Sequence, residues 1–220
     1  MTASFHPPGA LRRGLVLPAG GVFRSLMALL LFATVSASAS APDLVARLQQ
    51  GGHVLLLRHA IAPGLGDPPG FRLGDCTTQR QLDERGRAQA VAIGDALRAR
   101  GIREARVYSS QWCRCLETAS LMRLGPVTPL PALNSFFERT EDRERNLAAL
   151  RDFLARQPAD GSPLVLVTHH VNIQAVSGIN VGSGEGVVLQ LQPGAAPRLV
   201  GRLDIGSPDA GMESPAPAAK

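Results

Sequence analysis

Two short apolar segments of this sequence end in histidine. The first, residues 53–58, reads HVLLLR and is followed by His59, and the second, residues 163–168, reads PLVLVT and is followed by His169 and His170. Imidazole titrates near neutral pH and can act as a nucleophile, an acid or a base. Three of the four histidines after residue 39 stand at these two positions, so we interpret them as candidate catalytic residues.

Each of these histidines follows a segment whose pattern predicts a strand. A short, continuous apolar run is typical of a strand that is buried on both faces of a parallel sheet. In open α/β sheets, ligands bind beyond the carboxyl ends of such strands, which is where these histidines would lie. His53 opens the first strand at the opposite edge, and we interpret it as structural.

Around these two strands the pattern alternates between strands and helices. Helices are predicted over residues 83–100, 109–123 and 145–156, with Asp83 as one N-cap and Ser109 or Ser110 as another. Further strands are predicted at residues 106–108, 186–191 and 198–203, the last two as a hairpin, with an irregular segment or short strand at 126–134. The alternation predicts an α/β fold, a three-layer sandwich whose mostly parallel central sheet is flanked by helices.

The composition narrows the possible functions. Residues 40–220 carry 20 basic and 18 acidic side chains, a net charge of +2, and aromatic residues make up 4% of the chain. A nucleic-acid-binding protein would need more positive charge and more aromatic stacking surface, so we expect no nucleic-acid partner. The chain has 22 arginines and a single lysine, and arginine binds phosphate or carboxylate through two parallel hydrogen bonds.

Residues 1–39 are interpreted as a cleaved signal peptide. Arg24 precedes an apolar run of about ten residues, too short to span a bilayer of roughly 30 Å, and small residues follow, with cleavage best placed after Ala39. An uncleaved membrane anchor is the alternative. We therefore expect a domain over residues 40–205 that is periplasmic or secreted, has no stable membrane span, and ends in a disordered tail over 206–220.

Three cysteines, Cys76, Cys113 and Cys115, allow at most one internal disulfide. Cys113 and Cys115 are too close on a predicted helix to pair easily, so we expect Cys76 to bond to one of them in an exported protein. The three lack the CxxC spacing of a metal site. We expect neither a metal nor another cofactor.

Four motifs in order resemble the histidine phosphatase superfamily, which has the phosphoglycerate mutase-like fold. Residues 58–60, RHA, resemble the family's Arg-His-Gly, and VYSSQWCRCLETA resembles its strand–helix motif with Arg114 matched. Residues 81–102 resemble the family's first helix, and the strand that ends at His169 resembles its late motif. The resemblance spans residues 51–191.

The resemblance implies phosphoryl transfer without a metal. In the family the first histidine is the nucleophile, which implies that His59 forms a phosphohistidine that water then hydrolyses. Arg58 and Arg114 would bind the phosphoryl oxygens. His169 would stabilise the transferring group from the opposite side, and the late motif implies that Asn172 binds substrate.

The general acid is where the sequence departs from the family. One branch uses a glutamate at a position that residues 134–135 occupy here, with Glu138 three residues later. The other branch uses an aspartate where this chain has His170. Glu138 and His170 are therefore both candidates for the acid, and Glu141 and Asp142 are further alternatives.

Three functions stay open at this point. The leading hypothesis is an exported phosphatase of a small phosphomonoester. The export signal and short loops resemble those of exported bacterial members such as the lipopolysaccharide core heptose phosphatase, which implies an envelope phosphosugar as substrate. The second is hydrolysis of phosphohistidine or another phosphoramidate, since such leaving groups need less help from a protein acid. The third is a non-catalytic phosphate-binding protein.

Overall fold

The computed structural model describes residues 40–158 and 161–205. The predicted signal peptide, residues 1–39, and the predicted tail, residues 206–220, lie outside the described residues. Within the described ranges, no helix is both long enough and apolar enough to cross a membrane. Export and cleavage therefore stay predictions.

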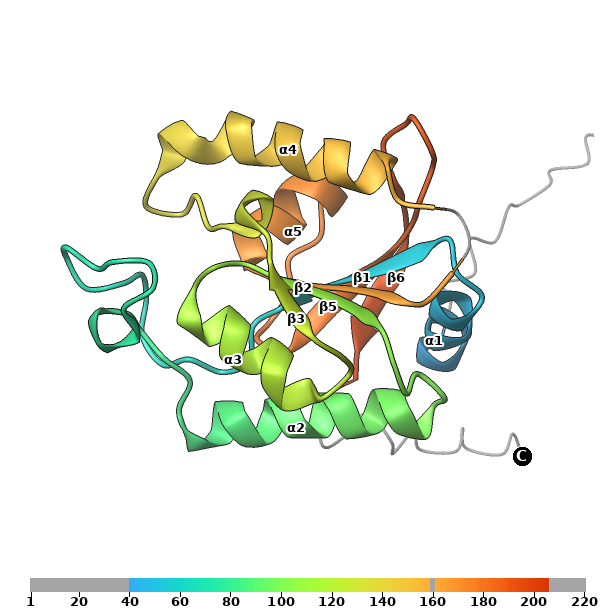
Figure 1. The fold of residues 1–220 in the computed structure, drawn as a ribbon, viewed down its shortest axis with the longest axis horizontal. Helices are drawn as coiled ribbons and strands as arrows, with labels where there is room; N and C mark the ends of the chain where they lie inside the picture. Colours follow the sequence, from blue (N-terminus) through green and yellow to red (C-terminus); the bar gives the residue numbers. More distant parts are fainter. Residues whose placement is uncertain (1–39, 159–160, 206–220) are drawn as a thin grey trace, which may run out of the picture. The chain divides into compact units, whose positions relative to one another are not determined.

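A six-stranded sheet forms the centre of the domain (Figure 1). Its strands are β1 (His53–Arg58), β2 (Arg106–Ser109), β3 (Val127–Pro129), β4 (Leu164–Thr168), β5 (Glu185–Gln190) and β6 (Arg198–Asp204), in the spatial order β3-β2-β4-β1-β5-β6. The pairs among β1 to β4 are parallel, whereas β5 runs antiparallel to both β1 and β6. The mostly parallel sheet and its closing hairpin are as the sequence predicts.

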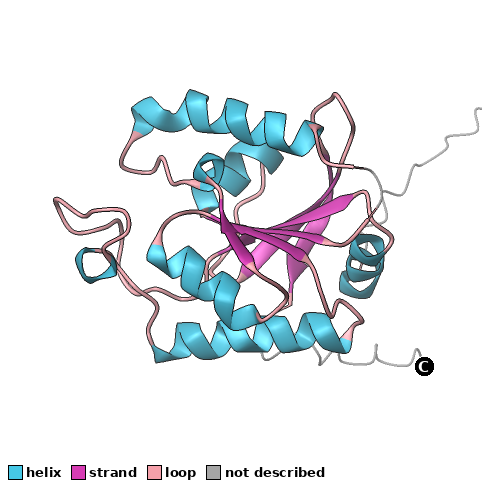
Figure 2. Cartoon of the chain, viewed as in Figure 1, coloured by secondary structure: helices cyan, strands magenta, loops and turns pink. Residues whose placement is uncertain are grey.

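Helices cover both faces of this sheet (Figure 2). They are α1 (Ala41–Gln49), α2 (Glu84–Ala99), α3 (Cys113–Met122), α4 (Arg143–Ala155) and α5 (His170–Ser177), with 3₁₀ turns at Cys76–Thr78, Pro131–Leu133 and Thr140–Asp142. Side chains of α1, α2 and α3 share one hydrophobic cluster, and those of α4 and α5 share another on the opposite face. The predicted three-layer sandwich is confirmed.

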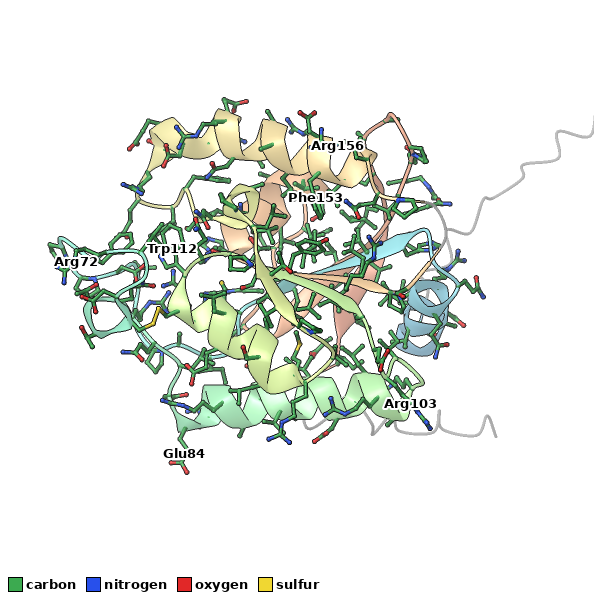
Figure 3. All side chains as sticks on the ribbon, viewed as in Figure 1. Arg72, Glu84, Arg103, Trp112, Phe153 and Arg156 are labelled. Carbon is green, nitrogen blue, oxygen red and sulfur yellow. A yellow bond between two sulfur atoms is a disulfide. The ribbon has the colours of Figure 1, made fainter. Side chains whose placement is uncertain are left out.

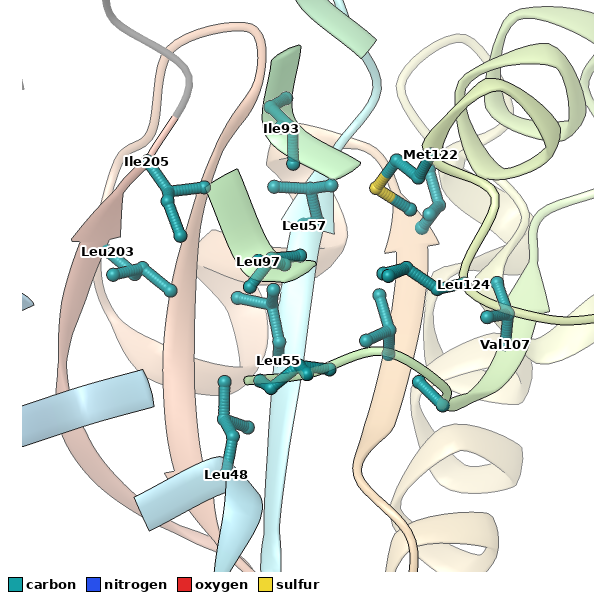
Figure 4. Close-up of a cluster of buried hydrophobic side chains, with 14 of the residues drawn as sticks. Leu48, Leu55, Leu57, Ile93, Leu97, Val107, Met122, Leu124, Leu203 and Ile205 are labelled. Carbon is teal, nitrogen blue, oxygen red and sulfur yellow. The ribbon is translucent and has the colours of Figure 1, made fainter. Parts of the chain in front are cut away.

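Strand β1 is continuously apolar because it contributes to both clusters. Leu55 and Leu57 pack on the side of α2 and α3 (Figure 4), whereas Val54 and Leu56 pack on the side of α4 and α5. All four side chains are fully buried, and each stabilises the fold by about 1.5–3 kcal/mol relative to an exposed position. A slip by one residue would move the half-buried His53 or Arg58 into a fully buried position, so the position at which the strand ends is well determined.

Parallel pairing of β1 with β4 brings the two predicted catalytic segments together. Arg58 is the register partner of Thr168 at the carboxyl ends of the two strands. The backbone N–H of His59 then donates to the Thr168 carbonyl at 3.0 Å. His59 and His169 consequently leave the sheet side by side.

Helix α2 fixes the path of the chain beyond His59. Asp83 caps the helix as predicted, and its carboxylate accepts a hydrogen bond from the Gly86 N–H at 2.7 Å. A Cβ atom at Gly86 would lie 1.9 Å from the carbonyl oxygen of Ile61. Only glycine allows this close approach between the helix and the segment after β1.

Helix α3 begins later than the sequence predicts. The predicted caps, Ser109 and Ser110, are wrong, because the N-cap is Trp112 and the first helical residue is Cys113. Ser109 still belongs to β2, and the hydroxyl of Ser110 is engaged with a ring nitrogen of His169 at 2.9 Å. Helices α1 and α5 lie in segments for which the sequence pattern gave no helix prediction.

A disulfide ties the β1–α2 loop, residues 62–80, to the start of α3 (Figure 3). Cys76 is bonded to Cys113, with Cα atoms 5.6 Å apart, whereas Cys115 is free and buried. The predicted bridge from Cys76 is confirmed, with Cys113 as its partner. The same loop also contacts α3 through Gln79, whose amide oxygen accepts from the Cys113 N–H at 3.0 Å.

We expect this disulfide to contribute about 3–4 kcal/mol to the free energy of unfolding, because it closes a long loop in the unfolded chain. For a domain of this size that corresponds to roughly 6–16 °C in melting temperature. Thermal unfolding of the Cys76→Ser/Cys113→Ser double variant should show this loss, and reductant should affect only the wild type. Equal melting temperatures, or three reactive thiols in unreduced denatured protein, would contradict the assignment.

Candidate active site

A cavity opens beyond the carboxyl ends of β1 and β4, where the sequence places the candidate residues. The side chains and loop segments that line it come from these two strand ends, the β1–α2 loop, the start of α3 and the segment before α4. They are Arg58, His59, Gly64, Leu65, Gly66, Asp67, Phe71, Arg80, Trp112, Arg114, Ser135, Phe137, Glu138, Arg139, His169 and His170. Six of the seven predicted site residues are therefore brought together, and the seventh, Asn172, is not part of the lining.

His59 is buried at the base of this cavity, with 3% of its surface exposed. Its Nδ1 lies 2.8 Å from the carbonyl oxygen of Ala60, so Nδ1 carries the proton and donates it. The other ring nitrogen, Nε2, then holds a lone pair, and it accepts a long hydrogen bond of 3.3 Å from Nε of Arg114. This tautomer presents Nε2 as a nucleophile.

Burial also keeps His59 uncharged. Desolvation is the largest effect and the positive charge of Arg114 is the next, and together they hold the pKa of His59 well below its ordinary value of 6.5. At neutral pH the ring is therefore neutral, as a nucleophile must be.

His169 faces His59 across the cavity, with ring centroids 5.5 Å apart. Its Nε2 lies 2.9 Å from the hydroxyl of Ser110, and its Nδ1 lies 3.5 Å from Nη2 of Arg114. Burial and then Arg114 hold the pKa of His169 well below 6.5. The two imidazoles thus share one guanidinium between them.

Cys115 of α3 contacts His169. Its sulfur is 3.5 Å from Nε2 of His169 and is fully buried. Burial raises the pKa of the Cys115 thiol to about 12, so the group stays protonated at neutral pH and adds no negative charge to the site.

Arg114 is almost completely buried and pairs with Asp67. Nη1 of Arg114 lies 2.9 and 3.0 Å from the two carboxylate oxygens of Asp67, and both side chains are less than 5% exposed. The sequence did not indicate Asp67, because an aspartate in a loop rich in glycine and proline is an ordinary turn residue.

Arg58 and Arg80 also line the cavity and are partly buried. Arg58 donates to the Val181 carbonyl at 2.9 Å, while its buried Nε has no hydrogen-bond partner among the described residues. Arg80, which the sequence did not single out among 22 arginines, donates through Nε to the Gly66 carbonyl at 2.7 Å. Burial is the largest effect on both guanidiniums and lowers their pKa. Together with Arg114 and Arg139, these side chains give the cavity four arginines beside the two buried, uncharged histidines, a setting suited to an anion.

The two candidate acids lie at the rim of the cavity. Glu138 is exposed, and its Oε2 accepts a hydrogen bond of 3.2 Å from the backbone N–H of Asp67. His170 is half-buried at the first residue of α5, with its ring 5.8 Å from that of Phe137. Burial and then Arg58 lower the pKa of His170.

The remaining candidates lie away from the cavity. Asp142 pairs with Arg145 at 2.6 Å, and neither Asp142 nor Glu141 is part of the lining. Asn172 is fully buried, and its Nδ2 donates to the Asn134 carbonyl at 3.1 Å. In this structure Asn172 thus holds the segment that carries Ser135 and Glu138, rather than facing the cavity.

Asn134 belongs to the hydrogen bonds that surround Ser110 and His169. Its Oδ1 accepts from the Gln111 N–H at 2.9 Å and lies 3.3 Å from the hydroxyl of Ser110. Because Ser110 contacts His169, Asn134 helps to orient that histidine. Among the described residues, no cluster of three or more His, Cys, Asp and Glu side chains could hold a metal ion.

Comparison with known structures finds the same fold in phosphatases. Protein histidine phosphatase SixA with tungstate is 15% identical, and the match covers 69% of this chain and 96% of that chain with a TM-score of 0.50. A proposed SixA from Nakamurella multipartitia is 20% identical, and the match covers 70% of this chain and 96% of that chain with a TM-score of 0.50. Phosphoserine phosphatase from Entamoeba histolytica with 3-phosphoglyceric acid is 14% identical, and the match covers 69% of this chain and 96% of that chain with a TM-score of 0.50. At these identities the likeness is one of fold.

Comparison by sequence gives a family match for part of the chain. No curated protein sequence matches it. The model of the histidine phosphatase superfamily, branch 1, matches residues 54–140, a segment that includes Arg58, His59 and Arg114. The described domain therefore has the phosphoglycerate mutase-like fold, and the part of it that holds these three residues matches the histidine phosphatase superfamily.

Proposed function

We propose that this protein is an exported member of the histidine phosphatase superfamily that hydrolyses a small phosphomonoester through a phosphohistidine on His59. The observation that carries the proposal is the state of His59: a buried, neutral imidazole whose Nε2 lone pair lies 3.3 Å from Nε of Arg114. A nucleophile beside a fixed guanidinium is what in-line attack on a phosphoryl group requires.

The reaction would proceed in two displacements. Nε2 of His59 attacks phosphorus, the P–N bond forms, and the P–O bond to the leaving group breaks with its electron pair on the leaving oxygen. Arg58 and Arg114 balance the charge of the phosphoryl oxygens, and His169 lies opposite His59. Water then attacks phosphorus, the P–N bond breaks, and His59 returns to its neutral form.

Glu138 is the better of the two candidates for protonating the leaving oxygen. His170 packs against the ring of Phe137, whereas the Glu138 carboxylate contacts the backbone of Asp67, the residue that pairs with Arg114. Glu138 lies at the mouth of the cavity, where the leaving group would emerge.

A phosphoramidate such as phosphohistidine is the second candidate substrate class. Both candidate acids are at the rim, and no carboxylate stands at positions 134–135, where branch members that cleave phosphate esters hold their acid. A protonated nitrogen leaving group needs less help of that kind. SixA, described as a protein histidine phosphatase, has the same fold, which is compatible with this alternative. An envelope phosphosugar remains the candidate within the phosphomonoester class.

The first prediction tests the nucleophile. His59→Ala should lower kcat on p-nitrophenyl phosphate by at least about 10³-fold, since loss of a nucleophile removes the covalent route. The matched control is His53→Ala, at the opposite end of the same strand, which should keep wild-type activity. Circular dichroism should show both variants folded, and a folded His59→Ala variant with more than a few per cent of wild-type kcat would refute the mechanism.

The second prediction concerns pH. Because burial and Arg114 lower the pKa of His59, its neutral form persists as the pH falls through 6.5 and is lost only at more acid pH. Because kcat/KM reports the ionisation of the free enzyme, kcat/KM on p-nitrophenyl phosphate should stay constant from about pH 7.5 down to about pH 6. A profile that falls to half near pH 6.5 would mean that the nucleophile titrates like an exposed histidine.

The third prediction separates the candidate acids. Glu138→Gln, which keeps an oxygen acceptor for the Asp67 N–H, should slow hydrolysis of alkyl phosphates by about 10²-fold or more. It should hardly change hydrolysis of p-nitrophenyl phosphate, whose leaving group is a weak base. His170→Asn should show no such difference between substrates. If both variants treat the two substrates alike, neither Glu138 nor His170 is the general acid, and the phosphoramidate class gains support.

A further inference from the structure

The buried pair of Asp67 and Arg114 goes beyond the roles that the family resemblance implies. We propose that Asp67 is a positioning residue that holds Arg114 so that the Nε–Nη2 edge of its guanidinium faces the transferring phosphoryl group. This inference rests on the proposed function of the site and assigns a part to a residue that none of the motifs includes.

The hydrogen bonds divide the guanidinium of Arg114 into two sides. Nη1 donates to both carboxylate oxygens of Asp67, at 2.9 and 3.0 Å. Nε lies 3.3 Å from Nε2 of His59, and Nη2 lies 3.5 Å from Nδ1 of His169. The Nε–Nη2 edge, which is the fork that binds phosphate through two parallel hydrogen bonds, therefore faces the two histidines.

Asp67 is itself held in place by other groups. Its Oδ1 accepts from the backbone N–H of Arg80 at 2.9 Å, and its Oδ2 accepts from the indole N–H of Trp112 at 2.9 Å. Trp112 is buried at the N-cap of α3 and is labelled in Figure 3, and the β1–α2 loop is cross-linked to α3 through Cys113. Because several fixed donors hold this carboxylate, we expect it to stay bound to Arg114 when substrate enters, instead of being displaced by the phosphate group.

Charge explains why Arg114 needs such an anchor when the site is empty. The positive charges of Arg58, Arg80 and Arg114 all act on His59, and the two histidines beside Arg114 are neutral. A buried guanidinium without a counter-charge is strongly unfavourable, so without Asp67 the Arg114 side chain would turn toward another acceptor. Its fork would then be misaligned when the phosphoryl group arrives.

Asp67→Asn tests this because it keeps the shape of the side chain and removes its charge. We expect kcat/KM on p-nitrophenyl phosphate to fall by roughly 10²-fold, the scale of a misplaced stabilising group, and calorimetry to show weaker binding of orthophosphate. The matched control is Asp95→Asn, which removes the same charge from a solvent-exposed aspartate paired with Arg98 and should leave both quantities unchanged.

A double-mutant cycle distinguishes positioning from a general structural effect. In the Arg114→Lys background, Asp67→Asn should cost little further activity, because Asp67 acts through the guanidinium. Trp112→Phe, which keeps an aromatic ring and removes one donor to Asp67, should lower kcat/KM several-fold in the wild-type background only. This variant carries the test if Asp67→Asn does not fold.

Unchanged kcat/KM and phosphate affinity in folded Asp67→Asn, or in Trp112→Phe, would overturn the inference. Tighter binding of orthophosphate by Asp67→Asn would overturn it too, since Asp67 would then compete with phosphate for Arg114. The phosphate-binding comparison does not depend on turnover. A wild-type protein that binds orthophosphate but hydrolyses no phosphate ester or phosphoramidate would refute the proposed function. The orthophosphate affinities of the wild type and of Asp67→Asn would then decide whether Asp67 positions Arg114.

Discussion

Parallel pairing of β1 with β4 is the interaction on which the site depends. It places Arg58 level with Thr168 and joins the His59 backbone to the next strand, so that His59 and His169 emerge from one edge of the sheet. The apolar residues of both strands are buried on both faces, and the half-buried polar residues at the two ends of β1 limit its register. The geometry of the two imidazoles is thus a consequence of core packing, and the loops add the charged groups around them.

The two buried histidines are neutral within a strongly positive cavity. Burial has the largest effect on the pKa of His59, and the positive charges of Arg114, Arg58 and Arg80 lower that pKa further. Asp67 compensates Arg114 in the buried part of the cavity, while Glu138 lies at the exposed rim. The net positive charge favours binding of an anion, and the neutral imidazoles do not repel the arginines that would hold it.

The sequence predicts the parts of this arrangement that come from regular strands and from motif residues. The apolar runs before His59 and His169 predict the parallel strands, and the spacing of the cysteines predicts a bridge from Cys76. Asp67 and Arg80 were beyond prediction because their parts arise from contacts between a loop and a distant helix. Local sequence shows Asp67 only as a turn residue, and its partner Trp112 lies 45 positions away. The predicted start of α3 is too early because of another contact between distant residues: the hydroxyl of Ser110 bonds to His169 and does not cap the helix.

The central claim is that a phosphoryl group is transferred to His59. The most direct test is to mix the enzyme with a phosphate ester, quench the mixture at alkaline pH within the first turnover, and locate the modified residue by peptide mass spectrometry. The account predicts phosphohistidine at His59 that forms with release of the leaving group and decays as free phosphate appears. Turnover without any phosphoenzyme, or a label on a residue other than His59, would contradict it.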